Sequence, residues 1–181
     1  EKNRLIIVGA GSLGKALVNM LSSEDFEIVV VESEEDVAKD IAEKTDTLVI
    51  KGDGTDIAIL KDAGIEEAHA IVVVTQDDKT NLMICEIAKN IKVDKIIARV
   101  NKPENEELFV ELGITSIVPI MTLAMTSIKR TLEKKGMRVI AELGNGKVEV
   151  SEIKVSKESK YVGKNVSSLK DAVVCTVYRD G

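Results

Sequence analysis

This sequence has few aromatic residues, no excess of positive charge and no long hydrophobic run. Aromatic residues make up 2% of its 181 residues and the net charge is −6, so it lacks the stacking side chains and the basic surface of a nucleic-acid-binding protein. No apolar run approaches the roughly 20 residues that a membrane-spanning helix needs. Because the first residues are typical of a strand rather than a signal peptide, we expect a cytoplasmic chain.

Cysteine is nearly absent as well. Cys85 and Cys175 lie far apart, each among apolar residues, and neither has the spacing of a metal ligand. This pattern argues against a disulfide or zinc framework and predicts two buried thiols and no metal site.

Short β-branched segments alternate with helical stretches along the first 120 residues. The alternation is typical of repeated βαβ units, and several segments are apolar throughout, as expected when helices cover both faces of a parallel sheet. Thr55 or Asp56 is expected to cap the helix that ends near Gly64, and Pro103 suits the first turn of the next helix. The pattern predicts an α/β fold, a Rossmann-like doubly wound parallel sheet. The expected strands are residues 4–8, 27–32, 47–50, 70–74, 95–100 and 116–119.

The pattern changes after residue 120. Residues 121–135 predict one more helix, ending at Gly136, with an apolar stripe that packs either on its own domain or on a partner subunit. The stripe consists of Met121, Met125, Ile128 and Leu132.

A small, partial α+β unit is expected after this crossover helix. Asn145-Gly146 lies between two alternating segments, which is typical of a β-hairpin. Residues 173–178 are typical of a further strand, and the sequence then stops where a turn normally leads into another one. We therefore expect three parts: a nucleotide-binding domain at 1–120, a connecting helix at 121–136 and a partial second domain at 137–181.

The nucleotide expectation comes from a glycine motif. Gly9, Gly11 and Gly14 follow a predicted strand and open a predicted helix, where they suit a tight turn, a close approach of the backbone to a pyrophosphate, and close helix packing. Glu32 closes the second predicted strand, where an acidic residue accepts hydrogen bonds from ribose hydroxyls and repels a 2′-phosphate. NAD(H) therefore fits better than NADP(H), while ATP, ADP and AMP carry the same ribose.

The sequence offers few candidates for catalytic residues. His69, the only histidine, precedes the fourth predicted strand, whereas ligands in such sheets bind at the carboxyl ends of strands. Asp77 and Lys79 follow that strand at the correct end, but a charged pair in a polar loop is usually solvated. Two functions stay open at this point: a small NAD-dependent oxidoreductase and a soluble redox-sensing domain.

Three segments carry a more specific resemblance. They are "IVGAGSLG" at 7–14, "KGDGTDIAILKDAGIEEAHAIVVVTQDDKTNLM" at 51–83 and "IIARVNKPENEELFVELGITSIVPI" at 96–120. With their GDGTD loop, T-x-x-D-x-x-N segment and A-R-V strand end, they resemble the RCK or TrkA-type regulatory domains of potassium transporters and channels. The tail, through "YVGKNVSSL" to "VVCTVYRDG", is similar to the opening of that family's C-terminal domain.

The resemblance implies a cytosolic regulator rather than an enzyme. Such a domain binds NAD(H) or ATP/ADP and passes the resulting change of shape to a pore-forming potassium transporter or channel subunit, at the inner face of the membrane. It also implies homodimers that assemble into rings, with the helix at 121–135 between partners.

The resemblance further implies which residues form the pocket. Asp53 would lie near the adenine, Thr75 and Gln76 beyond the fourth strand, and Arg99 at the end of the fifth. Two alternatives stay open: a salt bridge between Arg99 and the helix after it, and an Asx turn at Asp53. The complete expected site is Gly9, Ala10, Gly11, Ser12, Leu13, Gly14, Glu32, Asp53, Thr75, Gln76 and Arg99.

Overall fold

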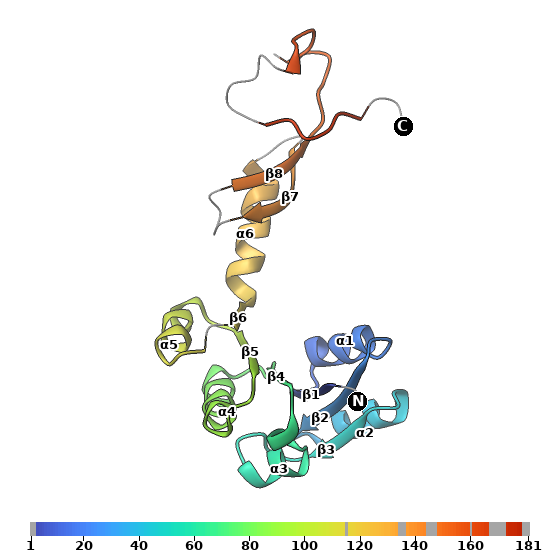
Figure 1. Cartoon of the computed structure of the whole chain (residues 1–181), viewed down its shortest axis with the longest axis vertical. Coiled ribbons are helices and arrows are strands. Elements are labelled where there is room, and N and C mark those ends of the chain that lie inside the picture. Colours follow the sequence, from blue (N-terminus) through green and yellow to red (C-terminus); the bar gives the residue numbers. More distant parts are fainter. Residues whose placement is uncertain are drawn as a thin grey trace. The chain divides into compact units, whose positions relative to one another are not determined.

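A computed structural model of the chain describes residues 3–114, 116–133, 137–143, 148–159, 161–166 and 173–178. The chain divides into two compact units, Glu1–Thr126 and Ser127–Gly181 (Figure 1). Within the described ranges, no helix is long and apolar enough to cross a membrane.

A parallel sheet forms the centre of the first unit. Its six strands lie in the order β3-β2-β1-β4-β5-β6, so the winding direction reverses between β1 and β4, as in a doubly wound fold (Figure 1). The predicted Rossmann-like architecture is confirmed. The strands are β1 (Asn3–Val8), β2 (Phe26–Glu32), β3 (Leu48–Lys51), β4 (Ala70–Val73), β5 (Lys95–Val100) and β6 (Ser116–Pro119).

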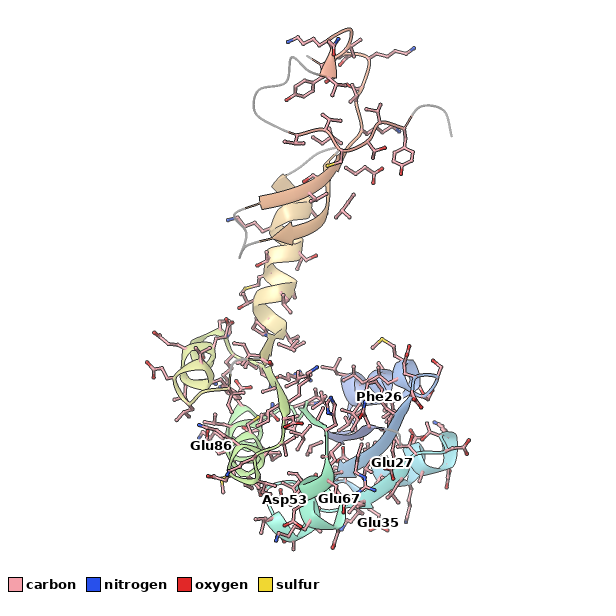
Figure 2. The ribbon with its side chains drawn as sticks, viewed as in Figure 1. Phe26, Glu27, Glu35, Asp53, Glu67 and Glu86 are labelled. Atoms are coloured by element: carbon pink, nitrogen blue, oxygen red, sulfur yellow. The ribbon has the colours of Figure 1, made fainter. Side chains whose placement is uncertain are left out.

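Helices cover both faces of this sheet because its central strands are apolar on both sides. Leu5 and Ile7 of β1 pack in one core cluster with α1 (Ser12–Leu21) and α2 (Glu35–Lys44). Ile6 and Val8 belong to the other cluster, which includes residues of α3 (Ile57–Asp62), α4 (Asp78–Ile91) and α5 (Glu106–Glu111). The short 3-10 helices are η1 (Ile65–Glu67) and η2 (Pro103–Asn105). Charged side chains such as Glu35 and Glu86 lie on the outside of these helices (Figure 2).

Two of the expected helix starts are confirmed. Asp56 caps α3, since its carboxylate accepts a hydrogen bond from the backbone N–H of Ala58 at 2.9 Å. Pro103 opens η2, which leads directly into α5.

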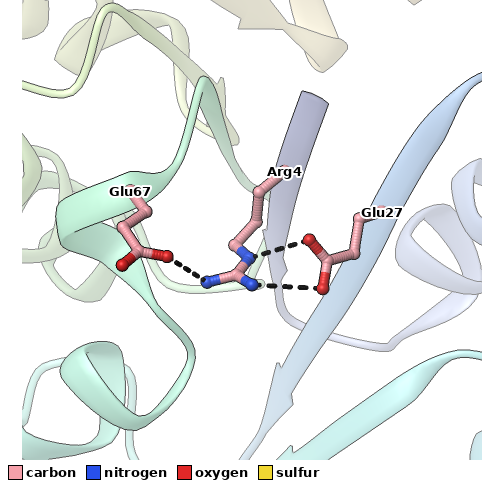
Figure 3. A network of polar contacts seen from close by, with 3 residues as sticks. All are labelled: Arg4, Glu27 and Glu67. Carbon is pink, nitrogen blue, oxygen red and sulfur yellow. Dashed lines mark hydrogen bonds and ion pairs between the residues drawn. The ribbon is translucent and has the colours of Figure 1, made fainter. Parts of the chain in front are cut away.

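An ion-pair network joins elements at the amino edge of the sheet. Arg4 of β1 donates two hydrogen bonds of 3.1 Å to Glu27 of β2 and one of 3.1 Å to Glu67 of η1 (Figure 3). The bond to Glu27 raises the pKa of Arg4, with burial opposing it and the charges of Glu27 and Glu67 adding to it. The network stabilises the amino edge of the sheet, where the strands begin.

The helix after β6 is α6 (Ile120–Glu133). Its expected apolar stripe is exposed to solvent: the exposed fraction is 50% for Met121, 48% for Met125, 61% for Ile128 and 77% for Leu132. The expected helix end at Gly136 lies outside the described residues.

A β-hairpin belongs to the second unit. β7 (Met137–Leu143) pairs antiparallel with β8 (Val148–Ile153), as predicted, while the Asn145-Gly146 turn itself lies outside the described residues. The predicted strand at residues 173–178 is wrong: these residues pair with no strand in the part of the chain that the structure describes. An apolar, β-branched run becomes a strand only where a neighbouring strand accepts its hydrogen bonds.

The prediction of two buried thiols is half correct. Cys85 is buried in the core, but Cys175 is exposed, because the segment that carries it joins no sheet of the described residues. Burial, with a smaller contribution from the charge of Glu86, raises the pKa of the Cys85 thiol to about 12.

We therefore expect one thiol to react quickly with a disulfide reagent and the other to be protected from it. A disulfide reagent at neutral pH should modify Cys175 at once and Cys85 only when the domain unfolds, because only an accessible thiolate reacts. Mass spectrometry of the modified peptides, with and without denaturant, measures this. Rapid modification of Cys85 in the folded protein would contradict the burial.

Candidate functional site

One cavity of about 660 Å³ lies at the carboxyl edge of the sheet. Residues at or just beyond the ends of β1, β2, β3, β4 and β5 line it, together with Ile120, the first residue of α6. Nine of the eleven expected site residues are among the lining residues: Gly9, Gly11, Ser12, Leu13, Glu32, Asp53, Thr75, Gln76 and Arg99. Ala10 and Gly14 are buried and are not part of the lining.

The three glycines of the loop after β1 differ in what they contact. Gly9 has a φ of +98°, and a Cβ there would lie 3.0 Å from the backbone N of Thr75. A Cβ on Gly14 would lie 2.0 Å from the carbonyl oxygen of Gly9. A Cβ on Gly11 would meet only the Nε2 atom of Gln76, at 3.9 Å, so Gly11 faces the open cavity.

The helix after this loop presents uncapped amides. Gly11 is the N-cap of α1 and supplies no side-chain hydrogen bond, so Ser12, Leu13 and Gly14 begin the helix with backbone N–H groups that no cap satisfies. A helix N-terminus of this kind attracts anions through its N–H groups and its partial positive charge. The lining residues at this position therefore suit a phosphate group.

Glu32 is held in place by the backbone around it. Its Oε2 atom accepts a hydrogen bond from the N–H of Ala10 at 2.6 Å, and its Oε1 atom accepts one from the N–H of Glu34 at 2.9 Å. The side chain of Ser33 also donates to Oε1, at 3.3 Å. These bonds fix the carboxylate beside the glycine loop, where its remaining lone pairs are available to hydroxyl donors.

Asp53 has the local role that one of our alternatives assigned to it. Its Oδ1 atom accepts hydrogen bonds from the N–H of Thr55 at 2.9 Å and from its hydroxyl at 2.8 Å, which is an Asx turn. Asp53 also lines the cavity, so the turn and an exposed carboxylate at the cavity wall occur together.

Thr75 is bound to α4 at the end of β4. Its N–H and hydroxyl donate to Oδ1 of Asn81, at 3.1 and 2.5 Å. The Nδ2 atom of Asn81 in turn donates to the backbone oxygens of Thr75 and Arg99, at 3.2 and 3.0 Å. Asn81 is fully buried and thus joins the ends of β4 and β5 to one helix.

Asp78 makes a second connection of this kind. Its carboxylate accepts hydrogen bonds from the N–H groups of Asn101 and Lys102 and from the side chains of Asn101 and Asn105, at 2.7 to 3.0 Å. Burial acts to raise the pKa of Asp78, but the hydrogen bonds from Asn105, Asn101 and Lys102 outweigh it and lower the pKa. Asp78 thereby holds the segment that follows β5.

Sequence reasoning used the T-x-x-D-x-x-N segment only as a mark of the family and missed these structural roles. The signal was present: residues three apart on a helix share a face, so Asp78 and Asn81 at the start of α4 face the same neighbours.

The guanidinium of Arg99 has no polar partner among the described residues. Its side chain lines the cavity, and its Nε atom is buried with no hydrogen-bond partner among the described residues. The alternative of a salt bridge to the following helix finds no support in that part of the chain. A buried N–H of a guanidinium that lacks an acceptor is costly, and an anionic or carbonyl group in the cavity would satisfy it.

The other polar residues that we considered lie apart from this arrangement. His69 precedes β4 at the amino edge, where its backbone N–H donates to the backbone oxygen of Arg4 at 3.0 Å. Asp77 caps α4 by accepting from the N–H of Thr80 at 2.8 Å and from its hydroxyl at 2.9 Å. Neither His69, Asp77 nor Lys79 is among the residues that line the cavity.

Curated proteins similar to this chain are components of potassium uptake systems. One is a TrkA homolog of the Trk potassium uptake system from Methanothermobacter thermautotrophicus, 31% identical over 180 residues, which cover 98% of this chain and 83% of the relative. A second TrkA homolog, from Methanosarcina mazei, is 29% identical over 99% of this chain, which spans only 41% of that relative.

Solved structures with this fold include structures of GsuK with a bound nucleotide. The GsuK channel bound to NAD superposes with a TM-score of 0.63 and 25% identity, over 77% of this chain and 24% of the channel. GsuK bound to ADP gives a TM-score of 0.61 and 25% identity, over 68% and 32%.

The family assignment rests on a match that covers most of the first unit. A family model described as the TrkA-N domain matches residues 5–120, the region that contains the parallel sheet except for the first two residues of β1, and all residues that line the cavity. Together with the 31% identity to a TrkA homolog along nearly the full chain, this match shows that the chain belongs to the TrkA-N domain family.

Proposed function

We propose that this chain is the nucleotide-binding regulatory part of a potassium transporter or channel, and that it acts by binding rather than by turnover. A single observation carries the proposal: one cavity combines the uncapped start of α1, the fixed carboxylate of Glu32 and the unpartnered guanidinium of Arg99. These groups suit the phosphates, the ribose and a further polar group of an adenine nucleotide. The relatives named as TrkA homologs and the GsuK structures with NAD and ADP support this choice of ligand and system.

The residues present fit such a nucleotide. The N–H groups of Ser12 and Leu13 would hold phosphate oxygens, Glu32 would accept from the ribose, and Asp53 and Thr75 would line the two sides of the cavity. NAD(H) is the first choice, with ADP, ATP and AMP as alternatives. When bound, the nucleotide supplies a signal, since a ligand shifts a conformational equilibrium only through different affinities for its states.

The rest of the proposal concerns assembly. We assign residues 1–120 to the nucleotide-binding domain, 121–136 to a connecting helix and 137–181 to part of a second domain. The exposed apolar stripe of α6 supports a homodimer and a higher ring, because such a stripe marks an interaction surface. A cytoplasmic ring of this kind would reach the inner face of the membrane through a pore-forming potassium subunit.

Calorimetry on the purified chain tests the proposal. We expect NAD(H) or ADP to bind with a defined stoichiometry, without consumption of NADH, and to change the oligomer mass measured by light scattering. Glu32→Gln should weaken binding about tenfold, because an amide replaces a charged acceptor. Glu24→Gln removes an equal charge from an exposed site outside the cavity and serves as the control. If none of NAD, NADH, ADP and ATP binds, the proposed function is rejected.

A further inference from the structure

The first turn of α6 contacts two different parts of the first unit. Ile120, the first residue of the helix, lines the cavity, and the hydroxyl of Thr122 donates a hydrogen bond to Oε1 of Glu106, the first residue of α5. Residues two apart on an α-helix project about 200° apart around its axis, so these two side chains leave α6 on opposite sides. The position of this turn therefore affects the cavity and the contact with α5 at the same time.

Glu106 belongs to a helix that is fixed at both ends. Just before α5, Nδ2 of Asn105 donates to the buried carboxylate of Asp78 on α4 at 2.7 Å. At the other end, Nζ of Lys89 on α4 donates to the carbonyl oxygen of Leu112, the C-cap of α5, at 2.5 Å. The carboxylate of Glu106 thus has a defined position, and it holds a hydroxyl donor through a charge-assisted hydrogen bond.

The bond from Thr122 attaches the start of α6 to another element. Within residues 120–126, the part of α6 in the first unit, no other side chain makes such a hydrogen bond in the part of the chain that the structure describes. Met121 and Met125, on the same turns, are exposed and belong to the apolar stripe that we propose as a dimer surface. The beginning of that stripe is therefore tied to the turn that borders the cavity.

We infer that Thr122 and Glu106 are positioning residues that couple the cavity to the dimer surface of α6, so that nucleotide binding and self-association strengthen each other. The inference rests on the proposed function. With the bond formed, one position of the helix places Ile120 at the cavity wall and leaves Met121 and Met125 exposed to a partner. A nucleotide and a partner therefore favour the same position of α6, and ligands that favour the same conformation bind cooperatively. Without the bond, α6 loses its polar attachment to α5, and occupancy of the cavity no longer fixes the position of the stripe.

Analytical ultracentrifugation of the full chain, with and without saturating ADP or NADH, tests this inference. We expect the nucleotide to lower the dissociation constant of the wild-type dimer about fivefold, at the low end of the usual coupling between two sites. In Thr122→Val, which removes the hydroxyl and keeps the shape of the side chain, and in Glu106→Ala, this factor should fall to less than about twofold. Thr122→Ser, which retains the hydroxyl, should keep most of the coupling. Glu107→Ala removes the neighbouring, exposed carboxylate of α5 and serves as the control.

The outcomes separate this inference from the proposed function. A wild type that binds ADP or NADH but self-associates equally with and without it, or not at all, overturns the inference and leaves nucleotide binding intact. Wild-type coupling in Thr122→Val and Glu106→Ala also overturns it, because a merely structural bond would lower the thermal unfolding temperature and leave the coupling factor unchanged. Failure of NAD, NADH, ADP and ATP to bind the wild type in calorimetry rejects the proposed function together with the inference.

Discussion

Replacement of Gly11 by alanine is expected to weaken nucleotide binding about a hundredfold, or about 2.7 kcal/mol, without unfolding the domain. A Cβ at this position would meet only Nε2 of Gln76, at 3.9 Å, and the backbone of Gly11, with φ −64° and ψ −168°, is one that any residue adopts. The fold therefore has room for the methyl group. A bound phosphate leaves no room for the methyl group, because the methyl group would occupy the space where the backbone of Gly11 must approach the phosphate.

The measurement combines calorimetry with thermal unfolding. Gly11→Ala should unfold at the wild-type temperature and bind NADH or ADP weakly. The same substitution at Gly14 provides the matched control, since its Cβ would lie 2.0 Å from the carbonyl oxygen of Gly9. We expect Gly14→Ala to lose about 3 kcal/mol of stability or more. Wild-type affinity in Gly11→Ala would contradict the assignment of this loop to phosphate binding.

The second large effect is expected at Asp78, on stability rather than on binding. Asp78→Ala removes the acceptor of four hydrogen bonds and leaves the N–H groups of Asn101 and Lys102 without it. We expect the free energy of unfolding to fall by about 3 kcal/mol, because hydrogen bonds to a charged group are strong and unpaired donors near the core are costly. Urea unfolding measures the change, and the exposed Asp94→Ala is the control.

The pH dependence of unfolding gives an independent check on Asp78. Its pKa is lowered in the folded chain, so it stabilises the fold above the pKa of the unfolded carboxyl, and this contribution is lost as the pH falls through the folded pKa. Below about pH 4, the wild type should therefore lose stability more steeply than Asp78→Ala. Parallel curves for the two proteins would show that Asp78 does not contribute in this way.

Several features of the fold followed from local sequence patterns. The apolar, β-branched runs predicted the six strands of the first unit, because a strand buried between two helical layers must be apolar on both sides. Single residues predicted both ends of α3. Asp56 caps its start, and Gly64, with φ +76°, adopts after its end a conformation that favours glycine. The position of Glu32 at the end of β2, beside the glycine loop, followed from the parallel order of the first two strands.

Other expectations failed where a residue depended on distant partners. The run at residues 173–178 has the composition of a strand, yet no described strand pairs with it, and Cys175 within it is exposed. The choice between a paired and an unpaired Arg99 was equally open from sequence, because an ion pair depends on the position of a carboxylate on another element.

The sequence by itself determined that this chain forms a doubly wound sheet with a glycine loop and an acidic residue at adjacent strand ends, since periodicity and glycine spacing act over a few residues. Only the tertiary structure decided which polar groups satisfy one another across that sheet. Asn81 joins the ends of β4 and β5, Asp78 holds the segment after β5, and Arg99 lines the cavity without a polar partner in the described part of the chain. These relations depend on strands that are distant in sequence and adjacent in space.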